Sequence, residues 1–116
     1  MRDQAKGVVM SVVCAEPDNQ RFCRRISAAV NPSPLFLSRV MVTGQQVYPF
    51  HDAVLGSPDT LLRCEFRIRD SSSSISDAHI HDLLHRLGTY EVIEAHTFDH
   101  RGSILDWVAV PVFVGG

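Results

Sequence analysis

The 116-residue sequence predicts an α+β fold, with one or two helices packed on one face of a single-layer antiparallel or mixed sheet of about five to six strands. Apolar and polar residues alternate over Leu62–Ile68, which is typical of a strand with one buried face. Four aliphatic residues instead recur at the i, i+3, i+4, i+7 spacing of one helical face, namely Ile80, Leu83, Leu84 and Leu87. A chain of this length is expected to form one domain, residues 1–116.

The first half begins with a strand and continues with a segment whose pattern allows two structures. Val8–Cys14 is rich in β-branched valine and predicts a strand, and Glu16–Asn19 supplies turn residues. In Gln20–Val30 the apolar residues fall at helical spacing, but part of the segment also alternates as a strand would. The sequence therefore leaves helix and strand open for residues 20–30.

Two prolines in Asn31–Pro34 end that segment, because proline lacks a backbone donor and biases the preceding residue towards extended geometry. Leu35–Val42 predicts the next strand, followed by a glycine-containing hairpin turn and a short return strand, Gln46–Phe50. Pro49 places this return strand at an edge or a bulge, because a central strand needs its N–H groups. Residues 51–59 are predicted to form a loop.

The predicted helix of the second half follows a polar connector, Asp70–Ser74. Ser74 or Ser76 is placed to cap its first turn, and Asp77 suits the positive end of the helix dipole. Gly88 is expected to end the helix in the left-handed conformation.

Two further strands are predicted after the helix. Tyr90–Phe98 alternates less cleanly and turns towards Ile104, whereas Trp107–Val114 is apolar on both faces and should be covered on both sides. With residues 20–30 as a helix, the element order resembles the ferredoxin-like arrangement with an added C-terminal strand. This resemblance implies no activity, because that superfold carries many unrelated functions.

The doubly apolar strand also predicts self-association. At most two predicted helices cannot easily cover a sheet of this size, so one face of Trp107–Val114 is expected to meet a second copy of the chain. We therefore expect a homo-oligomer, most simply a dimer.

Composition argues against several classes of function. Eleven basic and thirteen acidic residues give a formal charge of -2, which provides no strong attraction for nucleic acid or anionic lipid. No apolar stretch approaches the ~18 residues of a membrane span. Three cysteines without a C-x-x-C pair predict neither a disulfide framework nor a zinc knuckle. The expectation is a soluble, cytoplasmic protein without a cofactor.

One candidate site is an anion site at the end of the Leu62–Ile68 strand. Arg67 and Arg69 share the polar side of the strand, and Ser71, Ser72, Ser73 and Ser74 lead directly to the N-terminus of the helix. Guanidinium groups, hydroxyl groups and unpaired helical N–H groups can together receive a phosphate or carboxylate. The alternative is that the serines form only a connector and a cap.

The second candidate is a metal site on the helix. Asp77, His81 and His85 recur every four residues and lie on one stripe beside the apolar face, so two imidazoles and a carboxylate could hold a divalent cation. The alternative is a solvated helix face.

Two functions from different classes follow. The first is a non-catalytic module that self-associates or binds a small ligand, an anion included. The second is a small enzyme, with or without a metal ion, that uses the histidines. The sequence favours the first, because it contains no specific catalytic motif, and we assign no catalytic residue.

Overall fold

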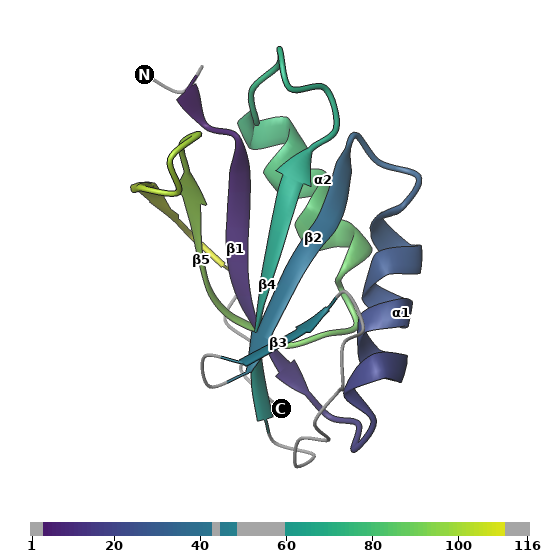
Figure 1. Ribbon diagram of the computed structural model, residues 1–116. Coiled ribbons are helices and arrows are strands. Elements are labelled where there is room, and N and C mark those ends of the chain that lie inside the picture. The colour runs from purple at the N-terminus through teal and green to yellow at the C-terminus, as the bar shows by residue number, and fades with distance from the viewer. Residues whose placement is uncertain (1–3, 43–44, 49–59, 111–116) are drawn as a thin grey trace.

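The computed structural model describes residues 4–42, 45–48 and 60–110. In this part of the chain one sheet has the strand order β3-β2-β4-β1-β5-β6, and every neighbouring pair is antiparallel. The strands are β1 (Gly7–Cys14), β2 (Leu35–Val42), β3 (Gln45–Tyr48), β4 (Thr60–Ile68), β5 (Val92–Phe98) and β6 (Ile104–Val108). The helices are α1 (Asn19–Val30) and α2 (Asp77–Arg86); in Figure 1, α2 lies behind the sheet and α1 lies at its side, next to β2. The predicted α+β fold is confirmed, and the sheet is antiparallel rather than mixed.

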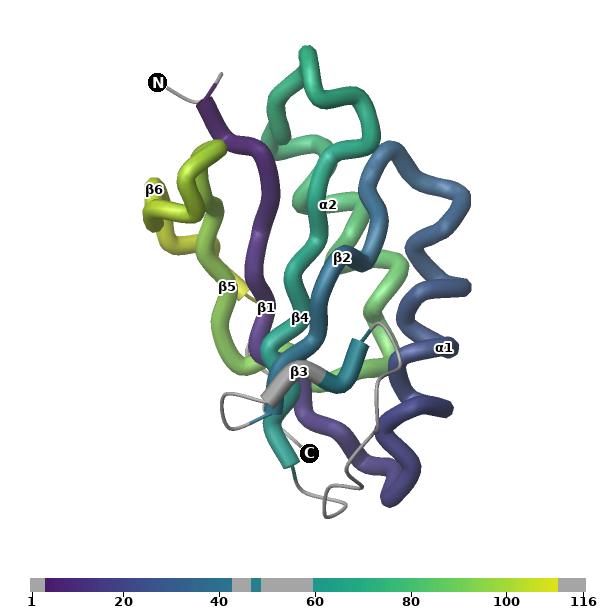
Figure 2. The backbone as a smooth tube through the Cα atoms, in the orientation of Figure 1, coloured from purple at the N-terminus to yellow at the C-terminus, as the bar shows by residue number. Residues whose placement is uncertain are grey.

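Residues 20–30, for which the sequence allows either a helix or a strand, belong to helix α1 (Figure 2). The Asp18 carboxylate accepts hydrogen bonds from the N–H groups of Gln20 at 3.0 Å and Arg21 at 3.3 Å, which caps the first turn of α1. One face of the helix is buried, formed by Asn19, Phe22, Cys23, Ile26 and Val30. This burial follows the helical period of the apolar residues, and the strand alternative is wrong.

Helix α2 has the predicted cap at its start and a different ending. The Ser76 hydroxyl accepts from the His79 N–H at 3.3 Å, while His79 Nδ1 accepts from the Ser76 N–H at 3.0 Å. At the other end the Leu87 N–H donates to the Leu83 carbonyl at 3.0 Å. The left-handed ending at Gly88 is wrong, because the glycine with positive φ in the described part of the chain is Gly102, at 83°.

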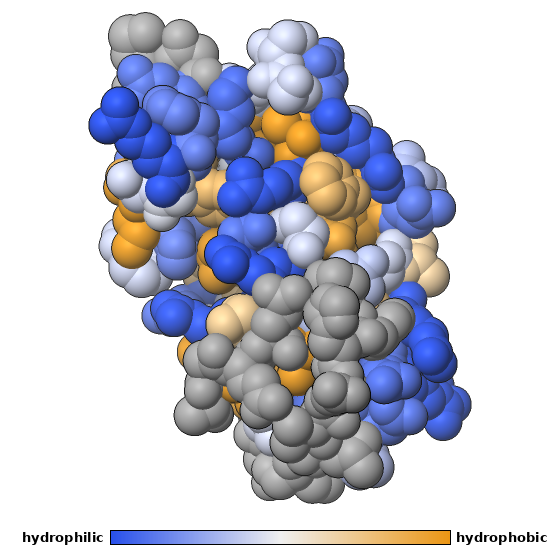
Figure 3. Space-filling view, in the orientation of Figure 1, coloured by the Kyte–Doolittle hydropathy of each residue, from blue (hydrophilic) through white to orange (hydrophobic). Residues whose placement is uncertain are grey.

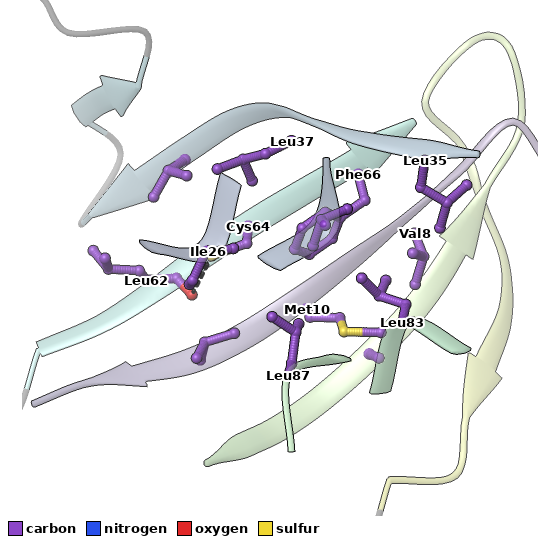
Figure 4. Packing of buried hydrophobic residues seen from close by; sticks show 14 of the residues in the cluster. Val8, Met10, Ile26, Leu35, Leu37, Leu62, Cys64, Phe66, Leu83 and Leu87 are labelled. Atoms are coloured by element: carbon purple, nitrogen blue, oxygen red, sulfur yellow. Dashed lines mark hydrogen bonds between the residues drawn. The ribbon is translucent and has the colours of Figure 1, made fainter. Parts of the chain in front are cut away.

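The core lies between the helices and one face of the sheet. Figure 4 shows strand side chains such as Met10 and Phe66 beside Leu83 and Leu87 from the α2 side. The β1 and β4 residues that pair across this face are fully buried: Val8, Met10, Val12, Leu62, Cys64 and Phe66. The alternation predicted for residues 62–68 therefore places the dry side of β4 under the helices.

We call the opposite side of the sheet the open face, because α1 and α2 do not cover it (Figure 1). Directly paired residues of antiparallel strands project to the same face. Four β1 residues and their β4 partners project to the open face, namely Gly7 with Arg67, Val9 with Glu65, Ser11 with Arg63 and Val13 with Leu61. Arginine and glutamate therefore occupy the middle of a surface that neither helix covers.

The last strand differs from the prediction. β6 begins at Ile104 because a turn closes after β5, with the Asp99 N–H donating to the Ser103 carbonyl at 3.0 Å. The strand ends at Val108, and residues 111–114 of the predicted Trp107–Val114 strand lie outside the described residues. β6 is an edge strand, and Trp107 is 63% exposed rather than covered on both sides. Apolar composition alone did not distinguish an edge strand from a central one.

The other strand boundaries shift only slightly. β4 begins at Thr60, two residues before the predicted start. β3 covers Gln45–Tyr48, and Pro49 and Phe50 of the predicted return strand lie outside the described residues, as does the predicted loop 51–59.

Candidate functional site

A groove of about 320 Å³ lies between α2 and β6, and we call it the α2–β6 groove. Its residues come from α2, from β5, from β6 and the residue after it, and from the segments that precede β1 and α2. They are Ala5, Ile75, Asp77, Ile80, His81, Leu84, Thr97, Asp106, Trp107, Val108 and Ala109. The groove thus joins segments that are far apart in the sequence.

Helix periodicity explains the α2 wall of the groove. Asp77, Ile80, His81 and Leu84 have the spacing i, i+3, i+4, i+7, so they share one helical face. The aliphatic members continue the core towards the groove, while Asp77 belongs to the first turn of α2, where the helix dipole favours a negative charge.

The Thr97 side chain forms two hydrogen bonds with the backbone of Asp106, in the β6 wall of the groove. Thr97 Oγ1 accepts from the Asp106 N–H at 3.1 Å and donates to the Asp106 carbonyl at 3.4 Å. The backbone beside the groove is therefore fixed to β5, which is a condition for a preformed site.

Trp107 connects the groove to the open face. Its ring packs edge-on against the His96 ring, with the centroids 5.2 Å apart. Burial lowers the pKa of His96, the positive charge of Arg63 lowers it further, and Glu94 opposes both. Near neutral pH the imidazole is thus held as an uncharged partner of the indole ring.

The predicted anion site already contains an anion of the chain itself. The Asp70 carboxylate accepts from the Ser72 N–H at 3.0 Å, from the Ser72 hydroxyl at 2.7 Å and from the Ser73 hydroxyl at 3.0 Å. The Ser71 and Ser73 carbonyl groups accept from Lys6 Nζ at 3.3 and 2.8 Å. An external anion would have to displace the Asp70 carboxylate, and Ser74 is also engaged in an interaction.

The two arginines of that prediction also have acceptors within the chain. Arg67 Nε donates to Glu65 at 3.1 Å, and its guanidinium lies 4.9 Å from the centroid of the Phe98 ring. Arg69 instead reaches the α1–β2 connection, where it donates to the Ser33 carbonyl at 3.2 Å and the Asn31 carbonyl at 3.0 Å. The structure therefore does not bring both guanidinium groups to the serines, and anion binding stays a prediction.

We expect Asp70→Asn to reduce the acid sensitivity of folding. The hydrogen bonds from Ser72 and Ser73 hold the pKa of Asp70 below its usual value. Its stabilising contribution is therefore present above the unfolded-state pKa of about 3.9, and is lost as the pH falls through the lower folded-state pKa. The difference in melting temperature between the parent and Asp70→Asn should shrink as the pH falls below about 4. A difference that is constant from neutral to acid pH would contradict this assignment.

Only two of the three residues of the predicted metal site line the groove. Asp77 and His81 line it, whereas His85, one turn further along α2, is not among its lining residues. Within residues 4–42, 45–48 and 60–110, no group of three or more His, Cys, Asp or Glu side chains is placed to hold a metal ion. The structure therefore adds no third ligand to this pair, and the metal-dependent enzyme remains a prediction without an observation in its favour.

The cysteines are part of the core. Cys14, Cys23 and Cys64 are buried free thiols. Burial raises the pKa of Cys23 to about 12, although Arg24 and Arg25 follow it in the sequence. Burial also raises the pKa of Cys14 and Cys64. Thiols held in the neutral form are poor nucleophiles, which supports a structural role.

Comparison with known proteins gives a likeness in fold. No protein-family model matches the chain, and no curated protein sequence matches it. Its fold is similar to part of the TT0538 protein from Thermus thermophilus, known from a crystal structure, with a TM-score of 0.69 and 21% sequence identity. The similarity covers 81% of this chain and 19% of that chain. The chain therefore spans under a fifth of the other protein, and the likeness concerns the fold alone.

Neither described helix is long and apolar enough to cross a lipid bilayer. The longer one, α1, has twelve residues, whereas a helical span needs about twenty.

Proposed function

We propose that the chain is a non-catalytic module that binds a small molecule in the α2–β6 groove. The observation that carries this proposal is the composition of the groove: mostly apolar walls, two carboxylates, Asp77 and Asp106, and no Lys or Arg among the lining residues. Its volume of about 320 Å³ is at the lower end of small-molecule pockets, which range over roughly 300–1,000 Å³. A ligand of this size is a compact metabolite rather than a polymer.

The same lining defines the class of ligand. Ile80, Leu84 and Val108 can bury an apolar body such as an aromatic ring. Carboxylates attract an ammonium group and repel an anion. We therefore propose a small amine with an apolar or aromatic body as the ligand of this groove, rather than the phosphate or carboxylate expected at the serine loop.

Matched probes test this proposal. Phenylethylamine should raise the melting temperature in a saturable manner, because a ligand that binds only the folded state stabilises it by RT ln(1 + [L]/Kd). Phenylpropionate has the same ring but a carboxylate in place of the amine, and it should give no saturable shift. Leu84→Trp should fill the groove and weaken amine binding about tenfold or more, and Asp106→Asn should weaken it through the lost charge.

A carboxylate away from the groove provides the control. Glu91→Gln removes an exposed charge outside the lining residues and should leave the affinity for phenylethylamine unchanged. Equal responses to the amine and the carboxylate, or an affinity that survives both Leu84→Trp and Asp106→Asn, would show that the ligand does not use this groove.

We further propose that the fold belongs to the ferredoxin-like type and that the chain works in a reducing compartment such as the cytoplasm. The order β2-β4-β1-β5, with α1 after β1 and α2 after β4, supports the fold assignment, and β3 and β6 then extend the two edges. The three free cysteines support the compartment, because secreted domains of this size commonly pair their cysteines.

A further inference from the structure

Strand register arranges the side chains of the open face in rows across the sheet. The row nearest the start of β1 contains Phe36, Arg67, Gly7, Phe98 and Ile104 in the order β2, β4, β1, β5, β6. The next row contains Arg39, Glu65, Val9, His96 and Trp107. The third contains Met41, Arg63, Ser11 and Glu94. Strand β1 forms the middle column of all three rows.

The two sides of this middle column differ in chemistry. The β2–β4 side carries three cationic side chains, Arg39, Arg63 and Arg67. The β5–β6 side carries groups that attract cations or pack as apolar surface: Glu94, His96, Phe98, Ile104 and Trp107. In Figure 3 hydrophilic surface occupies the centre of this face, and hydrophobic surface appears beside it over the β5–β6 edge.

Some of these side chains are left exposed, or lack a close partner of opposite charge, within the described part of one chain. Trp107 and Ile104 are 63% and 54% exposed, which is unusual for side chains of their size. Arg63 forms no ion pair with another described residue, and Glu94 is reached by the Ser11 hydroxyl at 3.5 Å. In contrast, Glu65 is surrounded, because Ser38, Arg39 and Arg67 all donate to it. The apolar edge and the Arg63–Glu94 row are thus available for an intermolecular contact.

A two-fold axis parallel to β1 makes this surface complementary to itself. Such an axis leaves each row in place but exchanges the two sides of the sheet, so β4 faces the partner's β5 and β2 faces the partner's β6. Arg63 then faces the partner's Glu94, and Arg39 faces the partner's Trp107. Arg67 instead keeps its contact with Phe98 of its own chain, which is 2% exposed. Each contact occurs twice, as two-fold symmetry requires. Stacked sheets lie about 10 Å apart, a gap that arginine side chains can span.

We propose that the open face is the docking surface for a second copy of this chain, related to the first by a two-fold axis along β1. Charge complementarity within a single surface selects this occupant, because the two exposed arginines, Arg63 and Arg39, meet a carboxylate and an aromatic ring. The arrangement also covers Trp107 and Ile104. It moves the expected self-association from the Trp107–Val114 strand to the open face, and it does not depend on a ligand in the α2–β6 groove.

Charge reversal tests the proposed pairing. The mass of the full chain is measured by sedimentation equilibrium without added ligand, from low to high micromolar concentration, for the parent, Arg63→Glu, Glu94→Arg and the double variant. We expect a dimer for the parent and a dissociation constant about tenfold or more higher for each single variant, because like charges then face each other. The double variant should recover dimerisation, since it restores opposite charges across the interface.

Two further measurements keep the test decisive. Trp107 is the single tryptophan of the chain, so acrylamide should quench its fluorescence less in the dimer than in a dissociated variant. Arg24→Glu changes an exposed charge on α1 and should leave the dimer intact. A monomer at every concentration would overturn the proposal. A dimer indifferent to both single reversals, or single defects that the double variant does not repair, would also overturn it.

Discussion

Replacing Phe22 by alanine should lower the free energy of unfolding by about 3–5 kcal/mol, the usual cost of removing a buried aromatic ring. Phe22 is 1% exposed on the inner face of α1, and its ring packs edge-on against Tyr90 with the centroids 5.3 Å apart. The alanine variant leaves a cavity under α1 and removes this aromatic contact. Urea unfolding followed by circular dichroism provides the measurement.

Two variants in the same region show whether the effect comes from the cavity. Arg24→Ala lies on the exposed side of α1 and should change stability by less than about 0.5 kcal/mol. Tyr90→Phe keeps the second ring and should cost far less than Phe22→Ala. A loss below about 1 kcal/mol for Phe22→Ala would mean that residue 22 does not occupy the core and that α1 is rotated about its axis.

The elements that the sequence predicts well are those whose burial is decided locally. β4 and α2 each show one period over their whole length, and the structure buries the expected face of each. Residues 20–30 fit two periods, so their helical structure depends on features outside the pattern. These features are the Asp18 cap and the packing of the α1 face on the core. The residue pattern does not predict the edge position of β6, because that position depends on pairing with β5.

The candidate sites show the same contrast between features that a local residue pattern predicts and features that depend on strand pairing. Asp77 and His81 could be paired from their helical spacing, and both line the α2–β6 groove. Thr97, Asp106 and Trp107 complete the groove through the return of β6 beside β5, which no local pattern contains. For Arg67, the sequence itself contained a sign that its guanidinium group has a partner within the chain. Glu65 lies two residues before Arg67 on the same strand face, which already supplies an internal acceptor.

The open face depends on a glycine at one position of β1. Gly7 is paired with Arg67 on one side and Phe98 on the other, and the Phe98 ring lies over it. The guanidinium of Arg67 stacks on the same ring. A Cβ atom at residue 7 would collide with Phe98 Cζ and with the backbone carbonyl of Phe66, and would lie 2.6 Å from Phe98 Cε1. The Phe98 side chain can move, but the carbonyl belongs to the β1–β4 ladder.

Gly7→Ala should therefore destabilise the fold by about 3 kcal/mol, at the upper end of the usual cost of overpacking. Gly102→Ala is the comparison, because a Cβ there meets nothing within 4 Å and only the positive φ of 83° opposes it, at a cost of about 1–2 kcal/mol. Adding Phe98→Leu to Gly7→Ala should recover part of the loss, since it relieves the contact with the ring but not the contact with the Phe66 carbonyl. If Gly7→Ala unfolds at the same urea concentration as the parent, the Phe98 ring does not lie over β1.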